Sequence, residues 1–264
     1  MRTNTKQLFG SLIKMLDLDC VCDIGSMDGK ESLFFRYLLP HARVIAFEAN
    51  PINYNMMQSN PTLAENRIEM FPYAITNRSG VASFHVTDVD YNHPNANKGT
   101  SSLLIHPGLK VKYSVDVETQ RLDDFILQRY LNAFRMALWI DVEGVEYSVL
   151  DGIERIVDCV YVVHVETAKK PMRQSQQTMN ELTGLMNAYG FLLCGSNIKQ
   201  SRNWGNVVFI RKAVIDELES KVLLCKCKAY FSKIFFVDKI AVMLKLKHQP
   251  IYSILRNVYR RLVY

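Results

Sequence analysis

The fold is decided by the stretch Asp23-Ile24-Gly25-Ser26-Met27-Asp28-Gly29. This stretch follows an apolar run at residues 20–22 and precedes a helical pattern over residues 31–39, so it predicts a strand, a glycine turn and a helix. Glycine in the turn tolerates positive φ and lets the backbone approach a ligand closely, while the helix start leaves N–H groups facing that ligand. The turn opens with an acid, Asp23, and a carboxylate suits a cationic or hydroxyl-bearing ligand better than a pyrophosphate.

Further strands and helices follow the turn in the same order. Residues 43–48 and 68–73 predict two more strands. Asn50 is a favourable N-cap and Pro51 a favourable first helical residue, so a helix is expected to begin between those strands. A β-α-β-α-β order is typical of an α/β protein with a parallel sheet covered by helices.

The pattern changes after residue 76. Residues 81–87 and 111–118 alternate apolar and polar side chains and predict an antiparallel hairpin, and the loop between them is long enough to be functional. The remaining segments are helices over residues 8–16, 121–130, 145–152 and 176–189, and strands over residues 136–141, 159–165, 191–195 and 206–210, the last two forming a terminal hairpin.

Charge divides the chain into two parts. The 264 residues carry a net charge of +6, yet residues 220–264 hold ten Lys or Arg against one acid, and the remainder is slightly acidic. We therefore expect one domain over residues 1–212 and a basic, amphipathic helical tail over residues 213–264. The cysteines are dispersed, and neither a secretory leader nor a long apolar span is evident, so we expect a cytoplasmic protein with reduced thiols.

Three functions are compatible with the basic tail. It can pack on the domain as a helical cap, bind an anionic membrane surface, or bind nucleic acid. Its aromatic side chains mix with apolar ones instead of lining a polar basic stripe. This composition favours peripheral contact with the inner face of the membrane, or docking of a partner, over nucleic acid.

An acid, Glu48, ends the second predicted strand, 25 residues after Asp23. Ligands of open α/β sheets bind beyond the carboxyl ends of the strands, where a carboxylate can accept hydrogen bonds from both hydroxyls of a ribose. Gly25 and Gly29 do not form the Gly-x-Gly-x-x-Gly loop that a dinucleotide requires. The combination favours S-adenosylmethionine over NAD, with Asp23, Gly25 and Glu48 holding the cofactor.

A second group of acids follows the later strands. Asp141 and Glu143 come after one predicted strand, and Glu166 ends the next strand at the same edge of the sheet. These carboxylates can take a proton from a hydroxyl or hold a divalent cation; we assign the proton to Asp141 or Glu143 and expect no resident metal. The structural alternatives are that Asp141 caps the next helix and that Glu146 lies on a solvated helix face. His164 alternates with buried positions and is expected in the core.

Taken in order, these motifs resemble the FkbM family of S-adenosylmethionine-dependent methyltransferases. The resemblance covers about residues 20–166 and excludes the basic tail. Ser26 and Met27 stand where the family often has Ala-Asn, which changes side chains near the cofactor but not the backbone. The matching pieces are Asp23-Ile24-Gly25-Ser26-Met27-Asp28-Gly29, Phe47-Glu48-Ala49-Asn50-Pro51, Tyr73-Ala74-Ile75, Ser101-Ser102, Arg121-Leu122-Asp123-Asp124, Ile140-Asp141-Val142-Glu143-Gly144-Val145-Glu146 and Leu150-Asp151-Gly152.

The resemblance implies a Rossmann-like class I methyltransferase fold with a seven-stranded, mostly parallel sheet. To that fold the residue pattern adds an inserted β-hairpin and a C-terminal helical extension. The resemblance also implies O-methylation, often of sugar hydroxyls, so the expected acceptor is a hydroxyl-bearing small molecule, a glycan or a lipid-linked saccharide. The cofactor-binding set then includes Ser26, Gly29, Ala49 and Ala74, and the acceptor side Ser101, Ser102 and Glu166. A nicotinamide-dependent oxidoreductase and a non-catalytic protein that binds S-adenosylmethionine remain as alternatives.

Overall fold

The computed structural model describes residues 4–90, 98–130 and 135–218. The predictions for most of the basic tail and for part of the long loop lie outside these described residues. The helices are α1 (Thr5–Leu16), α2 (Lys30–Leu38), α3 (Pro51–Gln58), α4 (Pro61–Glu65), α5 (Leu122–Arg129), α6 (Glu146–Asp151) and α7 (Met179–Ala188), with 3-10 helices η1 (Glu154–Cys159) and η2 (Lys212–Val214). The strands are β1 (Cys20–Ile24), β2 (Arg43–Phe47), β3 (Glu69–Phe71), β4 (Ala74–Thr76), β5 (Gly80–Thr87), β6 (Val111–Arg121), β7 (Met136–Ile140), β8 (Val160–Ala168), β9 (Phe191–Ser196) and β10 (Trp204–Arg211).

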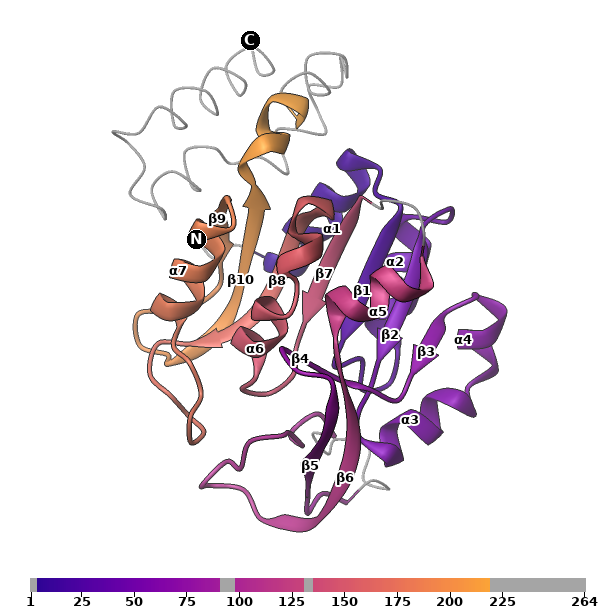
Figure 1. Ribbon diagram of the computed structural model, residues 1–264, viewed down its shortest axis with the longest axis vertical. Helices are drawn as coiled ribbons and strands as arrows, with labels where there is room; N and C mark the ends of the chain where they lie inside the picture. Colours follow the sequence, from indigo (N-terminus) through magenta and orange to yellow (C-terminus); the bar gives the residue numbers. More distant parts are fainter. Residues whose placement is uncertain (1–3, 91–97, 131–134, 219–264) are drawn as a thin grey trace.

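A large sheet with helices on both faces forms the body of the protein, and a small sheet projects from one end of it (Figure 1). The strand order of the large sheet is β3-β2-β1-β7-β8-β10-β9. Only β10 runs against its neighbours, because it pairs antiparallel with both β8 and β9, while the other pairs are parallel. The predicted α/β fold, with its seven-stranded, mostly parallel sheet and terminal hairpin, is confirmed.

The parallel strands end level with one another. Ile24 at the end of β1 is paired with Phe47 of β2 on one side and with Ile140 of β7 on the other, and Ile140 is paired with Val165 of β8. The residues that follow these four positions therefore emerge along a single edge of the sheet. This register brings strand-end residues that are far apart in the sequence into one site.

The two faces of the sheet bury separate cores, because successive side chains of a strand point to opposite faces. In β1, Cys20, Cys22 and Ile24 pack into the core beneath α5, α6 and α7, whereas Val21 packs into the core beneath α1 and α2. All four side chains are almost completely excluded from solvent. Burial on both faces explains why the strands read as continuous apolar runs.

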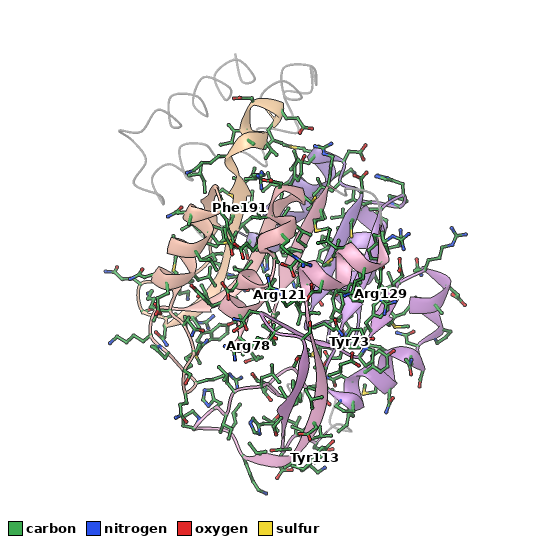
Figure 2. All side chains as sticks on the ribbon, in the orientation of Figure 1. Tyr73, Arg78, Tyr113, Arg121, Arg129 and Phe191 are labelled. Atoms are coloured by element: carbon green, nitrogen blue, oxygen red, sulfur yellow. The ribbon has the colours of Figure 1, made fainter. Side chains whose placement is uncertain are left out.

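The small sheet has the order β4-β6-β5. Its strands β5 and β6 are antiparallel, as the alternating segments predicted, and β4 adds a parallel strand that the sequence did not indicate. The predicted strand over residues 68–73 covers only β3, and the chain then crosses to the small sheet as β4. Arg121 lies where β6 leads into α5 (Figure 2), and its guanidinium donates to Asp123 and to the carbonyl of Asn77.

The described chain continues beyond the predicted domain boundary at residue 212. Val214 and Leu218 are buried in the core that also holds α1 and α2. The division at residue 212 remains a prediction, since most of the tail lies outside the described residues. Across residues 4–90, 98–130 and 135–218, no helix is sufficiently long and apolar to cross a membrane.

Candidate functional site

A pocket of about 520 Å³ opens at the edge where the parallel strands end. Its size is that of a small-molecule site. Its walls come from the strand ends, from residues 98–109 and from residues 172–176. Most of the predicted site residues line it, namely Asp23, Gly25, Ser26, Glu48, Ala49, Ala74, Ser101, Asp141, Glu143 and Glu166. Gly29 and Ser102 do not line it.

The glycine turn is shaped by contact with its neighbours. Gly25 has φ of 84°, and a Cβ atom there would lie 1.9 Å from the carbonyl oxygen of Asp141. The N–H groups of Gly25 and Ser26 donate to the carbonyl of Phe47 at 2.9 and 3.0 Å. Gly29 has φ of 77° and precedes α2, where a Cβ atom would meet the side chain of Leu63 at 2.7 Å. Gly25 therefore shapes the pocket, whereas Gly29 permits close packing behind it.

Asp23 is a buried acid on the pocket wall, with only 1% of its surface exposed. Its Oδ2 accepts hydrogen bonds from the hydroxyls of Ser26 and Ser32 at 2.7 and 2.5 Å. Burial raises the pKa of Asp23 to about 6, although the two hydroxyl donors oppose that shift. Its other oxygen, Oδ1, is buried without a hydrogen-bond partner among the described residues.

Glu48 lies on the same wall and is held by the backbone. Its Oε2 accepts from the N–H of Met27, and its Oε1 from the N–H of Asn50, both at 2.7 Å. Burial raises the pKa of Glu48 to about 7, against the lowering effect of these N–H donors. The side chain of Asn53 also hydrogen-bonds this carboxylate, which retains lone-pair capacity to accept a hydrogen bond from a ligand.

The half of the pocket formed by β1 and β2 fits a nucleoside with a charged side arm. Glu48 can accept hydrogen bonds from the two ribose hydroxyls of S-adenosylmethionine, as the sequence predicted. The unpartnered Oδ1 of Asp23 is a buried acceptor for which an ammonium group is a suitable donor. Ala49 and Ala74 are small apolar residues on the same side of the pocket. The residues present therefore fit this cofactor.

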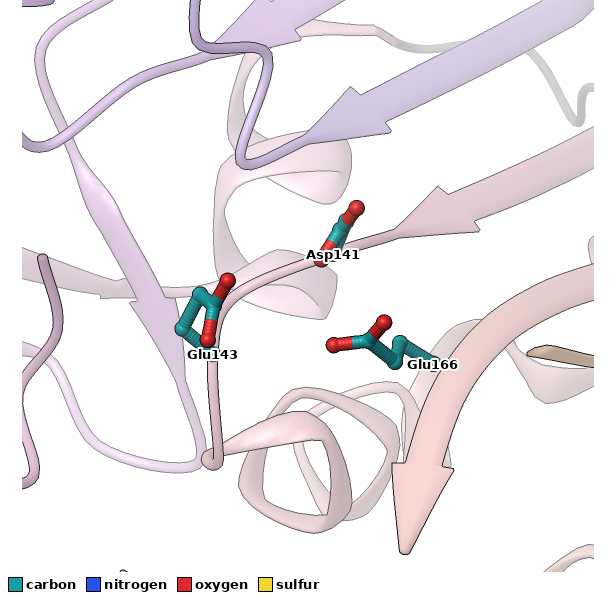
Figure 3. Close-up of side chains that lie close together, drawn as sticks. All are labelled: Asp141, Glu143 and Glu166. Carbon is teal, nitrogen blue, oxygen red and sulfur yellow. The ribbon is translucent and has the colours of Figure 1, made fainter. Parts of the chain in front are cut away.

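Three carboxyl groups lie together on the opposite half of the pocket. Asp141 and Glu143 are on the turn after β7, and Glu166 is on the neighbouring strand β8 (Figure 3). One oxygen from each of the three lies within 4.8 Å of the other two. Such a set of oxygens can bind a divalent cation, and it can equally share protons among its members.

Burial and neighbouring charges raise the pKa of two acids of this group. The pKa of Asp141 is raised well above its ordinary range, first by removal from bulk solvent and then by the charges of Glu166 and Glu143. The pKa of Glu166 is raised to about 8 by burial, Glu143 and Glu146, while Arg173 opposes that rise. The Asp141 side chain remains open to the pocket itself. Near neutral pH the group therefore holds at least one proton, and an ionised member is a competent base.

Glu143 is oriented by a buried cation. Its Oε2 accepts from Nη2 of Arg173 at 2.6 Å, and the Arg173 side chain is only 4% exposed. The backbone of Glu143 has φ of 60°, and the next residue, Gly144, has φ of 116°. Two successive residues of this turn therefore have positive φ, and the carboxylate on the first of them pairs with Arg173.

The two serines that were predicted on the acceptor side, Ser101 and Ser102, differ in position and in hydrogen bonding. Ser101 lines the pocket, and its hydroxyl accepts from the N–H of Thr87 at 3.1 Å. Ser102 is buried, and its hydroxyl donates to the carbonyl of Glu143 at 2.8 Å. Ser102 therefore positions the turn that carries Asp141 and Glu143, here called the carboxylate turn. Its own side chain does not line the cavity.

Two structural alternatives considered for the acids are wrong. Helix α6 has Val145 as its N-cap, so Asp141 does not cap it. Glu146 is not on a solvated face: it is 4% exposed, and its carboxylate accepts from the N–H of Gly144 at 2.7 Å. Glu146 was misjudged because a helix pattern alone does not reveal a side chain that folds back onto its own turn.

The expected core position of His164 is confirmed. Its ring stacks on Trp139 with centroids 3.5 Å apart, and its Nε2 contacts the hydroxyl of Thr5 at 3.2 Å. Burial, followed by the charge of Lys6, lowers the pKa of His164 to about 3. The ring is therefore neutral at physiological pH and supports Trp139, which lines the pocket.

Sequence reasoning missed several pocket residues. Trp204 begins β10, and its pairing with Ala168 of β8 carries it to the pocket edge. Arg173 lies between β8 and α7, in a stretch with no periodic pattern. The order in which β8 and β10 pair could have indicated Trp204, but no local signal marked Arg173.

Comparison with known proteins identifies the relatives of this chain. Residues 23–193 match the family model described as the methyltransferase FkbM domain. A curated protein, the 2-O-methyltransferase NoeI of Sinorhizobium fredii, is 23% identical over 175 residues, which span 64% of this chain and 71% of that protein.

Solved structures also resemble this chain. The O-methyltransferase from Bacillus cereus in complex with SAH is 11% identical, with a TM-score of 0.44 over 80% of this chain and 82% of that one. The magnesium protoporphyrin IX methyltransferase ChlM from Synechocystis, with bound SAM, is 10% identical, with a TM-score of 0.41 over 79% of this chain and 80% of that one.

Proposed function

Because this chain belongs to the FkbM family of S-adenosylmethionine-dependent methyltransferases, we propose that it methylates a hydroxyl oxygen of a sugar, carried by a glycan or a lipid-linked saccharide. The observation that carries this proposal is the carboxyl group cluster of Asp141, Glu143 and Glu166 beside the cofactor half of the pocket. A hydroxyl must lose a proton as it is methylated, and a cluster of basic carboxylates supplies an acceptor for that proton.

The roles within the cluster follow from its surroundings. When bound, S-adenosylmethionine supplies an electrophilic methyl group and leaves as neutral S-adenosylhomocysteine. Asp141, whose carboxylate has no hydrogen-bond partner among the described residues, accepts the hydroxyl proton as the acceptor oxygen takes the methyl group. Glu143 is held by Arg173 and orients the hydroxyl. Glu166, with its pKa of about 8, is protonated at neutral pH and can donate a hydrogen bond to a second acceptor oxygen.

Support for a sugar acceptor comes from chemistry and from one relative. The acceptor half of the pocket offers carboxylates, the hydroxyl of Ser101 and the indole rings of Trp139 and Trp204, which suit a ligand with several hydroxyls and apolar C–H faces. The relative NoeI is a 2-O-methyltransferase, which supports transfer of a methyl group to a hydroxyl oxygen. Family membership favours methyl transfer over the nicotinamide oxidoreductase alternative. We also propose that the basic tail contacts a membrane and that the protein lies on the cytoplasmic side of it.

The test is methyl transfer from S-adenosylmethionine labelled in its methyl group. The full chain is incubated with a panel of mono- and oligosaccharides, free and lipid-linked, and the products are analysed for base-stable methyl ethers. We expect Asp141→Asn to lower the transfer rate by about 10²–10⁴-fold, the usual contribution of a general base, with unchanged affinity for S-adenosylhomocysteine.

The matched control is Asp151→Asn, because Asp151 ends α6 and pairs with Asn77 outside the pocket. This control variant should transfer methyl groups at the rate of the original protein. An Asp141→Asn variant that is as active as the control would remove Asp141 from the reaction. Binding of S-adenosylhomocysteine without transfer to any sugar would favour the non-catalytic alternative.

A further inference from the structure

Arg173 is a buried cation in the segment between β8 and α7. Its residue surface is 5% exposed, and it lines the pocket next to the carboxyl group cluster. An arginine is rarely buried unless its charge and its five N–H donors find partners. The partners of Arg173 therefore indicate why it lies there.

The guanidinium group of Arg173 joins two segments that are far apart in the sequence. Nη2 donates to Oε2 of Glu143 at 2.6 Å and to the carbonyl of Thr100 at 3.3 Å, and Nη1 donates to the carbonyl of Leu104 at 3.1 Å. Glu143 belongs to the carboxylate turn after β7. Thr100 and Leu104 belong to the segment predicted to face the acceptor. One side chain thus fixes the carboxylate and the acceptor-side wall together.

The surroundings of Arg173 are arranged to hold it in this position. The N–H groups of Met172 and Arg173 donate to Oε1 of Gln176 at 2.8 and 3.1 Å, which secures the segment that carries the side chain. At Gly144, a Cβ atom would lie 2.6 Å from Cδ of Arg173, so glycine leaves the space through which the side chain passes. The hydroxyl of Ser102 joins the same two segments a second time, through the carbonyl of Glu143.

We propose that Arg173 is the positioning residue that assembles the acceptor half of the pocket, by holding Glu143 against the segment of residues 100–104. The assignment of this half to the acceptor rests on the proposed function, whereas the coupling of the two segments does not. Arg173 acts through Glu143 and the pocket wall, and its donors are directed to protein groups.

Substitution of Arg173 by lysine or by methionine separates the effect of its positive charge from that of its planar group of N–H donors. Arg173→Lys keeps the positive charge but lacks the planar fork that reaches three acceptors at once. Arg173→Met keeps much of the length of the side chain and removes both charge and donors. Lys169→Met is the matched control, because Lys169 lies on the same segment and its ammonium group donates only to the carbonyls of Lys199 and Gln200 among the described residues.

Hydrogen–deuterium exchange of the full chain measures the coupling without any acceptor. We expect the amides of residues 98–109 and 141–146 to exchange at least about tenfold faster in both Arg173→Lys and Arg173→Met, because the charge-assisted bonds that restrain them are lost. Exchange in β9 should stay unchanged, as should all exchange in Lys169→Met. Unchanged exchange of residues 98–109 in both Arg173 variants would overturn the proposal.

Titration of ¹³C-labelled glutamate carboxyl groups by NMR provides a second readout, with Glu166 assigned from Glu166→Gln. Since the charge of Arg173 lowers the pKa of Glu166, that pKa should rise in Arg173→Met and stay near its original value in Arg173→Lys. If the pKa of Glu166 is the same in the original protein and in both variants, the guanidinium group of Arg173 does not lie close to Glu166, which would contradict the proposal. Affinity for S-adenosylhomocysteine should be retained throughout, so a failure of this proposal is distinguishable from a failure to find the acceptor.

Discussion

At the scale of single residues, the pocket depends on acids that are held by backbone N–H groups. Glu146 is the clearest case, because its buried carboxylate accepts from the N–H of Gly144 and so closes the turn that carries Asp141 and Glu143. Burial raises the pKa of Glu146 to about 7 against the effect of that bond. The side chain therefore contributes a hydrogen-bond acceptor more than a charge.

Substitution of Glu146 should reveal that distinction. Glu146→Ala leaves the N–H of Gly144 without its partner, and a buried unsatisfied donor costs about 1–3 kcal/mol in the free energy of unfolding. Glu146→Gln keeps an oxygen acceptor and should cost less. Urea unfolding measures both values, with Glu154→Ala on the exposed side of η1 as the control. Equal losses for Ala and Gln would show that the hydrogen bond is not what matters.

Residues at strand ends were the predictable part of the site. Asp23 lies near the end of β1, Glu48 and Asp141 follow β2 and β7, and the parallel register then places all three at one edge. Arg173 was not predictable, because its partners are carbonyl groups and one carboxylate from distant segments. Burial of Glu146 was missed for a related reason, since its acceptor role depends on a backbone turn and not on a periodic pattern.

At the scale of elements, the turns after β1 and β7 touch through Gly25. The N–H of Asp141 donates to the carbonyl of Ile24 at 2.9 Å, and the carbonyl of Asp141 occupies the space where a Cβ atom of residue 25 would lie. The turn after β1 and the turn after β7 are therefore in direct contact at the edge of the sheet.

Two glycine-to-alanine substitutions should change the free energy of unfolding in opposite directions. Gly25→Ala meets a backbone oxygen at 1.9 Å at a positive φ, so it should lower the free energy of unfolding by more than about 1 kcal/mol and disturb the pocket. Gly184 lies in the exposed part of α7, and a Cβ atom there would have no neighbouring atom within 4 Å. Gly184→Ala should therefore raise the free energy of unfolding by about 0.5–1 kcal/mol. Thermal unfolding compares the two; a Gly25→Ala variant as stable as the original protein would contradict the contact.

Long elements were predicted more reliably than short ones. The strands of the large sheet and the pair β5 and β6 carry clear patterns, whereas β4 has only three residues and gains its partner from β6, which comes much later in the chain. Helix α4 is also short, with five residues, although Asn60 and Pro61 repeat the N-cap and first-turn signal of Asn50 and Pro51. Tertiary pairing, and not local preference, decides such short segments.

At the scale of the whole molecule, several buried acids should make the stability of the ligand-free protein depend on pH. Glu48 and Glu146 have pKa values of about 7, and Glu166 about 8, all raised by burial. Such groups bind more protons in the folded than in the unfolded chain, so their stabilising contribution is complete at low pH and is lost as pH rises through the folded pKa. His164 has the opposite sign, but its contribution is already complete above its unfolded pKa of about 6.5.

We therefore expect the free energy of unfolding to fall by a few kcal/mol between about pH 6.5 and pH 8, since one pKa unit corresponds to about 1.4 kcal/mol. Urea unfolding at several pH values measures this slope. Glu146→Gln, which cannot ionise, should make the slope shallower. A stability that rises over the same interval would show that these carboxyl groups are ionised more readily in the folded chain than their burial implies.

The most direct test of the central claim is calorimetric titration of the full chain with S-adenosylhomocysteine, S-adenosylmethionine and NAD, compared between the original protein and Glu48→Ala. We expect binding of the two adenosyl ligands and none of NAD. We also expect at least about tenfold weaker binding in Glu48→Ala, because a hydrogen bond to a charged group contributes roughly 1.5–3 kcal/mol. The control is Asp88→Asn, an exposed acid paired with Lys110. Binding of NAD, or an affinity for S-adenosylhomocysteine that Glu48→Ala leaves unchanged, would contradict the assignment of this pocket to the cofactor.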